Sequence, residues 1–578
     1  MNLISRRIFT VVALVLFTAL LIVAPNLNYP NVGYTAQPWL VARQSPEEAQ
    51  RLLQQGREFY QARQFAQAVS AWQQAAQIAA ARDDRLTEAT ALSNLALAQQ
   101  QLGAWSAARE AIITSLKRLG IRNGKAPKES GSAAYQQVVA QTFNTQGKLY
   151  FAAGQFELAL ESWQQATDRY RATRDAAGAT QSLLNQTQAL KALGLHRRAG
   201  TMLEMLYRDR QQQSPPLQLA ILLNYGDALR LLGRLADAPP DSQTVLQQGL
   251  NLATQLQSES NVAAFLVSLG NTARAQQTLQ ATRYFDQPDD LKQIYREALL
   301  YHQQTTQTAT LDPNIRRINA LLDEQTALVE ATFMTAEQLT EAQALSSQIQ
   351  AQIDRQHPSP STVHAYLRLA ENRILIDPES ANTTTIEILA KAAKQAETLG
   401  DFQMLAYARW RQYYQQALQY YQQAADIADT TSNSYLHALL NQQSLLLEGQ
   451  AIEPRQRLQA ESLSTQIQAQ LERRPLSHTV LYAQIHFAQN LLKIDQVKNR
   501  PQVIQQLEQV AKQAEQLQDV PTQSYALGYL GSIYERDRQW QTAQSFTQRA
   551  LSLAQATQAG HLIYRWQWQL GRLLKAQN

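Results

Sequence analysis

The sequence predicts an all-α fold, in which antiparallel helix pairs stack side by side into a solenoid. Gly and Pro are sparse, at 21 and 18 of 578 residues, while the helix formers Ala, Leu and Gln are abundant. A pattern of small and large residues recurs about every 40 residues, and a second, longer duplication fills the C-terminal half. A chain of 65.0 kDa is too long for one hydrophobic core, whereas a repeat array can grow without one.

The first 24 residues are expected to be a signal peptide or a membrane anchor. Arg6 and Arg7 precede an apolar run at 8–24, which ends at Pro25. Basic residues before such a run stay in the cytoplasm, so we expect the rest of the chain to be exported to a periplasmic or other extracytoplasmic space. Both a cleaved signal and an uncleaved anchor remain open, and in the second case residues 8–24 would attach the chain to the membrane. Residues 25–45 are expected to be a linker.

Residues 46–310 are expected to form about six helix pairs. A small residue in the middle of each first helix would let the second helix approach closely, and Gly in the turn would end the first helix at little steric cost. The small residue is followed twelve positions later by Ala: Gly56 with Ala68, Ala96 with Ala108, Gly147 with Ala159, Thr187 with Ala199, Gly226 with Ala238, and, near the C-terminus, Gly531 with Ala543. Three residues before each Ala stands a bulky side chain that would fill the turn: Phe65, Trp105, Phe156, His196, Leu235 and Trp540.

Two positions interrupt this regularity. Residues 120–132 predict an exposed loop between two pairs, and Pro239 with Pro240 delays the second helix of the fifth pair to near Asp241.

The pattern resembles the tetratricopeptide repeat (TPR) motif. Gly147, Tyr150, Ala159 and Trp163 form the clearest copy; Trp72 and Tyr534 take equivalent places in other copies. The resemblance implies a right-handed superhelix whose concave groove is lined by first helices and binds peptides. The spacing of about 40 residues exceeds the usual 34 of the family, so each pair should be about one helical turn longer.

The C-terminal half contains the larger duplication. The stretch from Ala344 recurs from Ser462 at an offset of 118 residues, and Tyr407 matches Tyr525 at the same offset. We expect a first copy at 311–459 and a second at 460–578, which ends on an unpaired helix. Beyond Tyr407 the first copy lacks the turn between helices, because Ala417 matches Ala543 at an offset of 126. Residues 402–429 are therefore either one long helix or an irregular joint.

Catalytic motifs are absent from the sequence. With no Cys, the chain has no thiolate metal site and no cysteine nucleophile, and it contains no phosphate-binding loop or paired-His metal motif. We therefore expect no enzyme activity, no cofactor, no metal and no small-molecule substrate. A net charge of +5 without a basic run argues against a nucleic-acid partner.

A protein or peptide is the partner that we expect, bound in the groove of first helices. Six polar residues flank the small mid-helix positions and are the candidates to bind it: Arg57, Asn94, Lys148, Asn185, Asn224 and Asn271. A recurrent Asn on a half-buried face needs a hydrogen-bond partner. That partner could be a bound peptide or a neighbouring helix, and both interpretations remain open.

The arrangement as a whole resembles the N-terminal region of cyanobacterial TPR–CHAT proteins, which carry a signal, Gln-rich repeats near 40 residues and duplicated segments. In that family the repeats precede a caspase-like CHAT peptidase domain with a His/Cys dyad. That domain is absent here, and no catalytic residue can be transferred. Three functions remain: an exported scaffold for protein–protein interaction, a truncated recognition region of a CHAT-type peptidase, or a structural spacer in the cell envelope.

Overall fold

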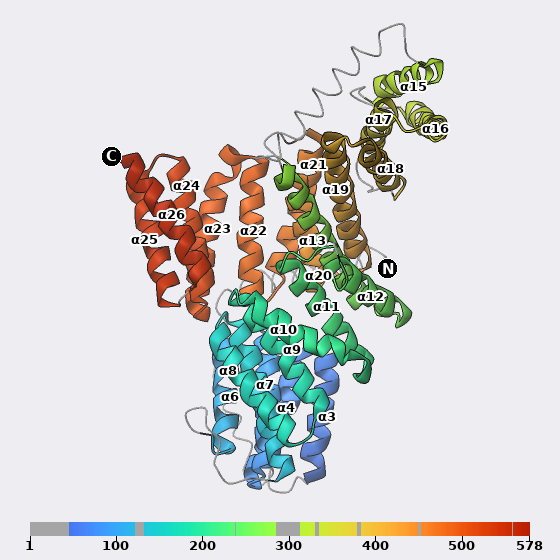
Figure 1. The fold of residues 1–578 in the computed structure, drawn as a ribbon. Coiled ribbons are helices and arrows are strands. Elements are labelled where there is room, and N and C mark those ends of the chain that lie inside the picture. Colours follow the sequence, from blue (N-terminus) through green and yellow to red (C-terminus); the bar gives the residue numbers. More distant parts are fainter. Residues whose placement is uncertain are drawn as a thin grey trace, which may run out of the picture.

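The structure, a computed structural model, describes residues 46–577 except 122–131, 237, 285–311, 330–334, 378–382, 449–451, 453 and 558. The expected signal or anchor, the linker and most of the expected loop at 120–132 lie outside these residues. The described chain is a succession of α-helices that stack into a solenoid (Figure 1). In chain order the helices of the first half are α3 (Pro46–Gln61), α4 (Phe65–Ala81), α5 (Arg85–Gln101), α6 (Trp105–Arg118), α7 (Ala133–Ala152), α8 (Phe156–Ala172), α9 (Ala176–Ala192), α10 (His196–Arg208), α11 (Pro215–Leu231), α12 (Ser242–Gln255) and α13 (Glu259–Tyr284).

The second half continues with twelve further α-helices among the described residues. They are α15 (Pro313–Val329), α16 (Ala336–Ile353), α17 (Pro360–Ile376), α18 (Thr383–Leu399), α19 (Phe402–Ile427), α20 (Asn433–Leu446), α21 (Pro454–Glu472), α22 (His478–Ile494), α23 (Gln496–Leu517), α24 (Val520–Arg536), α25 (Trp540–Ala556) and α26 (Gly560–Gln577). An all-α solenoid of TPR type is confirmed.

The small mid-helix residues make room for a large residue of the paired helix. A Cβ atom on Gly56 would lie 2.4 Å from Trp72 Nε1, and one on Gly147 would lie 2.4 Å from Trp163 Nε1. Each indole then donates to a carbonyl of the first helix, Trp72 Nε1 to Leu53 O at 3.1 Å and Trp163 Nε1 in the same way. The glycine is thus required by the indole sixteen residues later, which explains why the two recur together.

The turns within the pairs have the expected geometry. Gly103, Gly154, Gly194 and Gly233 have φ between +73° and +76°, the left-handed region that closes a helix. Arg63 and Arg538 occupy the same position in two other pairs, with φ of 59° and 57°. The bulky residues Phe65, Trp105, Phe156, His196 and Trp540 are the first residues of α4, α6, α8, α10 and α25.

The fifth pair corrects one predicted contact. Gly226 was expected to pair with Ala238, but a Cβ atom on Gly226 would lie 2.5 Å from Leu246. Asp241 caps the second helix, α12, by accepting a hydrogen bond from the Thr244 amide at 2.8 Å. The partner therefore lies four residues further along than in the other pairs, because Pro239 and Pro240 delay the helix start as the sequence indicated.

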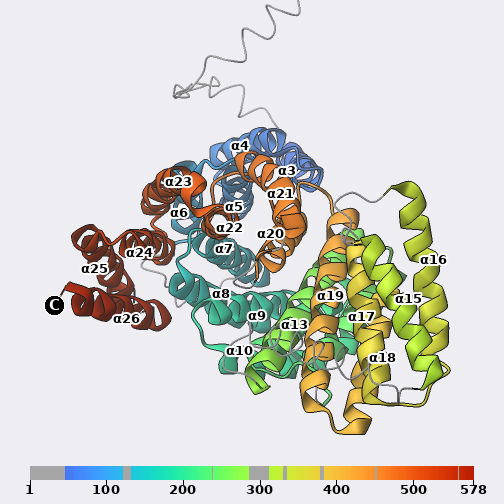
Figure 2. The ribbon, with the colours of Figure 1, turned by 90° about the horizontal axis from the view of Figure 1, so that it is seen from above.

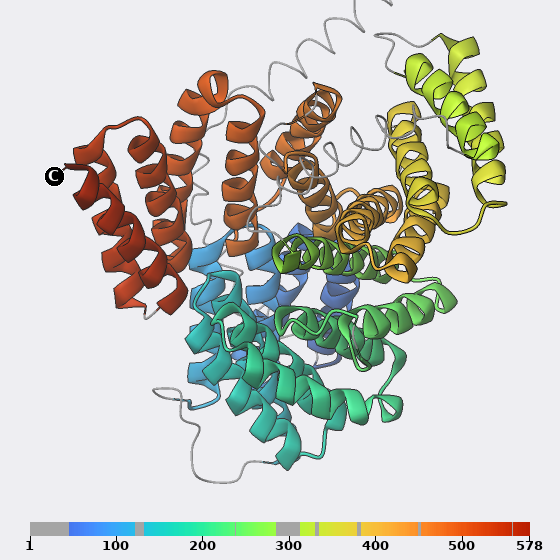
Figure 3. The ribbon, with the colours of Figure 1, turned by 45° about the horizontal axis from the view of Figure 1, so that its top comes forward.

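Helix α13 pairs with a helix that is distant from it in the sequence. A Cβ atom on Gly270 would lie 2.5 Å from the Tyr421 ring, and Tyr421 donates to Asn271 Oδ1 at 2.9 Å. Helices α13 and α19 run antiparallel, and α19 is continuous, which decides for one long helix at 402–427. Helices α15 to α18 lie between α13 and α19 in the chain and pack against α19 through α18, and their buried cluster includes Met404, Tyr407 and Trp410 of α19 (Figure 3). The sixth pair is therefore α13 with α19.

The duplication is reproduced down to a buried hydrogen-bond network. Gln325 Nε2 donates to Ala342 O at 2.9 Å, and Asn372 Nδ2 donates to Gln325 Oε1 at 3.1 Å. At an offset of 118 residues, Gln443 Nε2 donates to Ala460 O at 2.8 Å, and Asn490 Nδ2 donates to Gln443 Oε1 at 3.0 Å. The repeated unit thus starts earlier than the matched sequence shows, and α20 belongs to the second copy.

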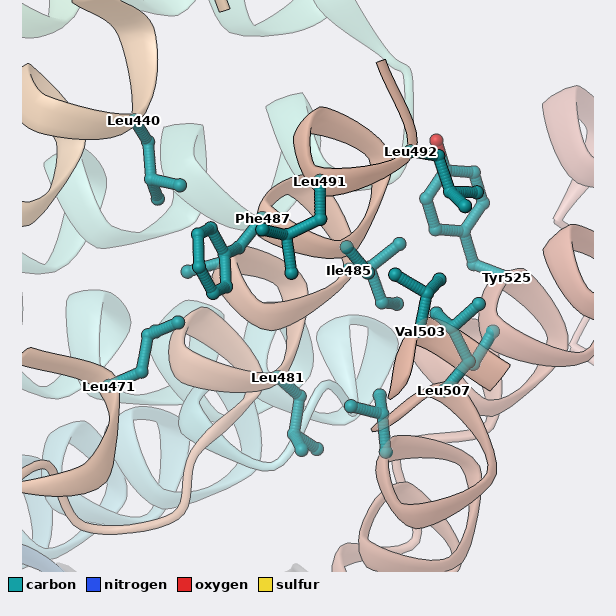
Figure 4. Packing of buried hydrophobic residues seen from close by; sticks show 14 of the residues in the cluster. Leu440, Leu471, Leu481, Ile485, Phe487, Leu491, Leu492, Val503, Leu507 and Tyr525 are labelled. Atoms are coloured by element: carbon teal, nitrogen blue, oxygen red, sulfur yellow. The ribbon is translucent and has the colours of Figure 1, made fainter. Parts of the chain in front are cut away.

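The largest buried cluster is built by this second copy. Side chains from α20 to α24 meet there, including Leu471, Leu481, Phe487 and Val503 (Figure 4). The cluster spans several helix pairs, as expected when no single pair can bury its apolar faces alone.

The C-terminal pairs stack on the turns of the N-terminal pairs (Figures 1 and 2). Trp105 Nε1 donates to Leu476 O at 3.0 Å, and Arg109 Nη2 donates to Leu517 O at 3.0 Å. The Phe156 ring meets the His478 ring at a centroid distance of 5.0 Å. We call this line of contacts the seam: the turns near residues 63, 104 and 154 on one side, and the loops 429–432, 473–477 and 517–519 on the other. Bulky turn residues therefore join two parts of the solenoid as well as filling their own turns.

Candidate functional site

The first helices of neighbouring pairs lie next to one another, as a binding groove requires. Contacts join α5 to α7, α9 to α11, α20 to α22 and α24 to α26. Of the predicted groove residues on these surfaces, Arg57 and Lys148 are exposed to solvent. The surrounding protein lowers the pKa of Lys148 by desolvation, although its side chain is open to solvent.

The predicted asparagines bond to neighbouring helices. Asn185 is 5% exposed and its Nδ2 donates to Asn144 Oδ1 on α7 at 2.9 Å. Asn224 Oδ1 accepts from Lys191 Nζ on α9 at 2.9 Å. Asn271 Oδ1 accepts from Asn441 Nδ2 on α20 at 3.0 Å, while Asn94 is half-buried on α5. These bonds agree with the interpretation that the recurrent Asn ties helices together, and a peptide-binding role of Asn224 and Asn94 stays a prediction.

Sequence reasoning missed a row of aromatic residues on the first helices of the C-terminal pairs. The Tyr482 ring on α22 stacks on the Tyr525 ring on α24, with centroids 5.4 Å apart and planes at 17°. The Arg565 guanidinium on α26 lies over the rings of Tyr525 and Trp566, at 5.0 and 5.2 Å from their centroids. Arg565 Nη1 also donates to the Tyr525 hydroxyl at 3.1 Å. The arginine is thereby held against the aromatic row.

The row ends at a pocket of about 490 Å³ between α24 and α26. Trp568 and Tyr564 line it and are 65% and 72% exposed. They are one helical turn apart on the surface of α26, whereas Trp566 between them is 1% exposed. The spacing of these aromatic residues was the signal that the sequence offered. Positions i and i+4 of a helix share one face and the residue midway between them lies on another, so Tyr564, Trp566 and Trp568 cannot all belong to the core.

Other chemical sites are not found in the described parts of the chain. No group of His, Asp and Glu there could hold a metal ion, and no described helix is long and apolar enough to cross a membrane. Asp83 and Asp84 are loop residues, of which Asp84 caps α5 by accepting from the Thr87 amide at 3.1 Å.

Comparison with known proteins finds similar chains among solved structures. No family model matches the chain, and no curated protein matches its sequence. Among solved structures, the TPR2AB domain of yeast Sti1 in complex with pHSP90 is 14% identical over 65% of this chain and 98% of that one, with a TM-score of 0.20. The Rap protein complexed with competence and sporulation factor is 9% identical over 89% and 99%, with a TM-score of 0.28.

The human IFIT1 dimer with m7Gppp-AAAA is 13% identical over 80% of this chain and 89% of that one, with a TM-score of 0.18. Scores this low carry no functional conclusion to this chain. Its class rests on its own helix pairs, which define a TPR-type α-solenoid.

Proposed function

We propose that the chain is a non-catalytic scaffold that binds a peptide segment of a partner protein in the groove of its first helices. The observation that carries the proposal is the pocket between α24 and α26, in which Trp568 and Tyr564 remain 65% and 72% exposed. Large exposed aromatics beside a pocket are typical of surfaces that bury them against a partner.

The chemistry of the pocket favours an acidic segment with an apolar anchor residue. Arg536, Arg565 and Arg572 line the pocket beside the two exposed rings. Arg572 Nη2 is held by Glu535 Oε2 at 2.8 Å, and Arg565 by the aromatic row, so both guanidiniums are pre-positioned. Carboxylates of a bound segment would meet these cations, while an apolar side chain would enter between the rings. A rigid helical surface lowers the ordering cost of such binding.

The test is a selection of displayed random peptides on the purified chain, followed by affinity measurement of the selected peptides. We expect selected sequences rich in Asp, Glu and apolar residues, whose binding falls at least about tenfold in Trp568→Ala and Arg536→Gln. Met205→Ala is the matched control, because Met205 on α10 is also 64% exposed and lies on a second helix. Peptides that bind all three variants equally would overturn this site, and a failure to select any peptide would favour the structural spacer.

We also propose that the protein is exported, and that a CHAT-type peptidase domain joined to these repeats is the alternative to a scaffold that acts alone. The basic and apolar pattern of residues 1–24 supports export, and the resemblance of the Gln-rich repeats to TPR–CHAT proteins supports the second point. Cell fractionation with an antibody against the repeats, together with the size of the native product, tests both. A product near 65.0 kDa in the cytoplasmic fraction would contradict both.

A further inference from the structure

A second cavity lies in the seam, away from the groove of first helices. Its volume is about 770 Å³, large enough for a small organic ligand. One wall comes from the turns of the N-terminal pairs and contains Arg63, Phe65 and Trp105. The other wall comes from the C-terminal loops and contains Arg473 and Arg474. The cavity therefore exists only because the two halves of the solenoid meet.

The cavity carries positive charge that the protein compensates only in part. Three arginines line it, and no acidic residue is among the described residues of its walls. Asp429 lies just outside and meets Arg63 Nη1 at 3.4 Å, with both side chains more than half exposed. Burial and the nearby Arg63 lower the pKa of Arg474, which Asp429 offsets in part. Two arginines from opposite walls are thus close enough to repel each other.

Arg474 is fixed in place but not fully bonded. Its Nη1 donates to Asn433 Oδ1 at 2.9 Å and its Nη2 donates to Ser432 O at 2.6 Å. Its Nε is buried and has no acceptor among the described residues. The Arg474 Nε is therefore able to bond to an additional acceptor.

Polar donors complete the walls. Ser432 and Ser477 line the cavity and cap α20 and α22, helices of 14 and 17 residues, by accepting hydrogen bonds from the Tyr435 and Val480 amides. Helix starts carry partial positive charge, which favours phosphate oxygens. The aromatic rings of Phe65, Trp105 and Phe151 are half-buried on the N-terminal wall, where they offer surface to a flat ring.

We propose that the seam cavity binds a phosphate-bearing small molecule, which joins Arg63 of the N-terminal pairs to Arg473 and Arg474 of the C-terminal loops. Phosphate groups would supply negative charge and further acceptors to the three arginines, and they would lie beside the two helix starts. The aromatic wall favours a ligand in which the phosphates are attached to a ring over an inorganic one. Because its two walls come from opposite halves, the bound ligand holds the seam closed.

Calorimetric titration of the full chain with ADP, inorganic pyrophosphate and adenosine tests the proposal. We expect ADP to bind more tightly than pyrophosphate and adenosine not to bind. Equal affinities of ADP and pyrophosphate would assign the site to inorganic phosphates. Binding of adenosine as tight as that of ADP, or no binding of either phosphate compound at millimolar concentration, would overturn the proposal.

Two variants separate this cavity from general attraction of anions. Arg473→Gln and Arg63→Gln each remove one charge-assisted donor and should weaken ADP at least about tenfold. Arg198→Gln on α10 makes the same charge change at an exposed site and should leave the affinity unchanged. An equal loss in all three variants would overturn the site. With wild type, ADP should also slow hydrogen exchange at 429–434 and 473–480, and unchanged exchange there would refute the closing of the seam.

Discussion

Replacement of Gly154 by Ala tests whether the two halves of the solenoid meet as the structure shows. Gly154 has φ of 73°, and a Cβ atom there would lie 2.2 Å from Asp519 Oδ1, across the seam. Gly194 has φ of 75° in an equivalent turn and no atom within 4 Å of its Cβ position. Gly194→Ala is therefore a control for the backbone cost alone, which is about 1–2 kcal/mol for a non-glycine residue in this region.

The additional cost at Gly154 follows from the bonds of Asp519. This carboxylate is fully buried, caps α24 by accepting from the Thr522 amide at 3.2 Å, and lies 2.7 Å from His478 Nδ1. Making room for a methyl group would displace it. Loss of the cap costs about 1 kcal/mol and loss of the second bond about as much or more. We therefore expect Gly154→Ala to be about 2 kcal/mol more destabilising than Gly194→Ala.

Urea unfolding followed by far-ultraviolet circular dichroism measures the difference. Gly103→Ala gives an internal check, because its Cβ would lie 3.9 Å from Pro475, an ordinary contact, and its cost should match that of Gly194→Ala. Equal losses in Gly154→Ala and Gly194→Ala would refute the close contact between Gly154 and Asp519, and with it the seam.

Three further predictions follow from buried groups and from a strained turn. Gln443→Leu should lower the free energy of unfolding by about 2–3 kcal/mol, because Ala460 O and Asn490 lose their bonded partner. Gln325→Leu should lower it by the same amount within about 0.5 kcal/mol, because it removes the equivalent bonds. Unequal urea midpoints of the two variants would contradict the duplicated network. Burial, with smaller effects of His486 and Arg474, lowers the pKa of His437 from 6.5 to about 4, so the unfolded chain binds more protons between these values. The contribution of neutral His437 to the free energy of unfolding should be fully present above pH 6.5 and should fall by at most about 3 kcal/mol as the pH drops towards 4. In His437→Asn the thermal unfolding midpoint should therefore depend less on pH over that range. Arg538→Gly should raise the free energy of unfolding by up to about 1 kcal/mol, because φ of 57° favours glycine; a lower thermal midpoint would show that the Arg side chain outweighs the strain.

Much of the local structure was predictable. The start of each second helix, the left-handed turns and the fit of Gly56 to Trp72 follow from residues within about twenty positions of one another. The asparagines show where prediction stopped. Their recurrence showed that they need partners, but a recurrent Asn on a half-buried face is equally suited to a peptide and to a helix. Only the hydrogen bond from Asn185 Nδ2 to Asn144 Oδ1 in the folded chain distinguishes the two at that position.

The binding surfaces were less accessible to sequence reasoning. Trp105 was interpreted as the filling of its own turn, and it also donates to Leu476 O, 371 residues away. Trp566 and Trp568 are residues of the same type only two positions apart, yet their exposed fractions are 1% and 65%. Which of two neighbouring aromatics is free to bind depends on how α25 and α24 pack against α26.

The sequence by itself determined the class of this protein, because each helix pair is defined by short-range fits between small and large residues that repeat along the chain. The tertiary structure alone decided that α13 pairs with α19 across 150 residues, and that the loops at 473–477 close over the first turns. The physical reason is that each helix pair is rotated slightly relative to the one before it, and these small rotations add up along the solenoid. A delayed helix start or a missing turn changes that sum, and with it the residues that finally meet.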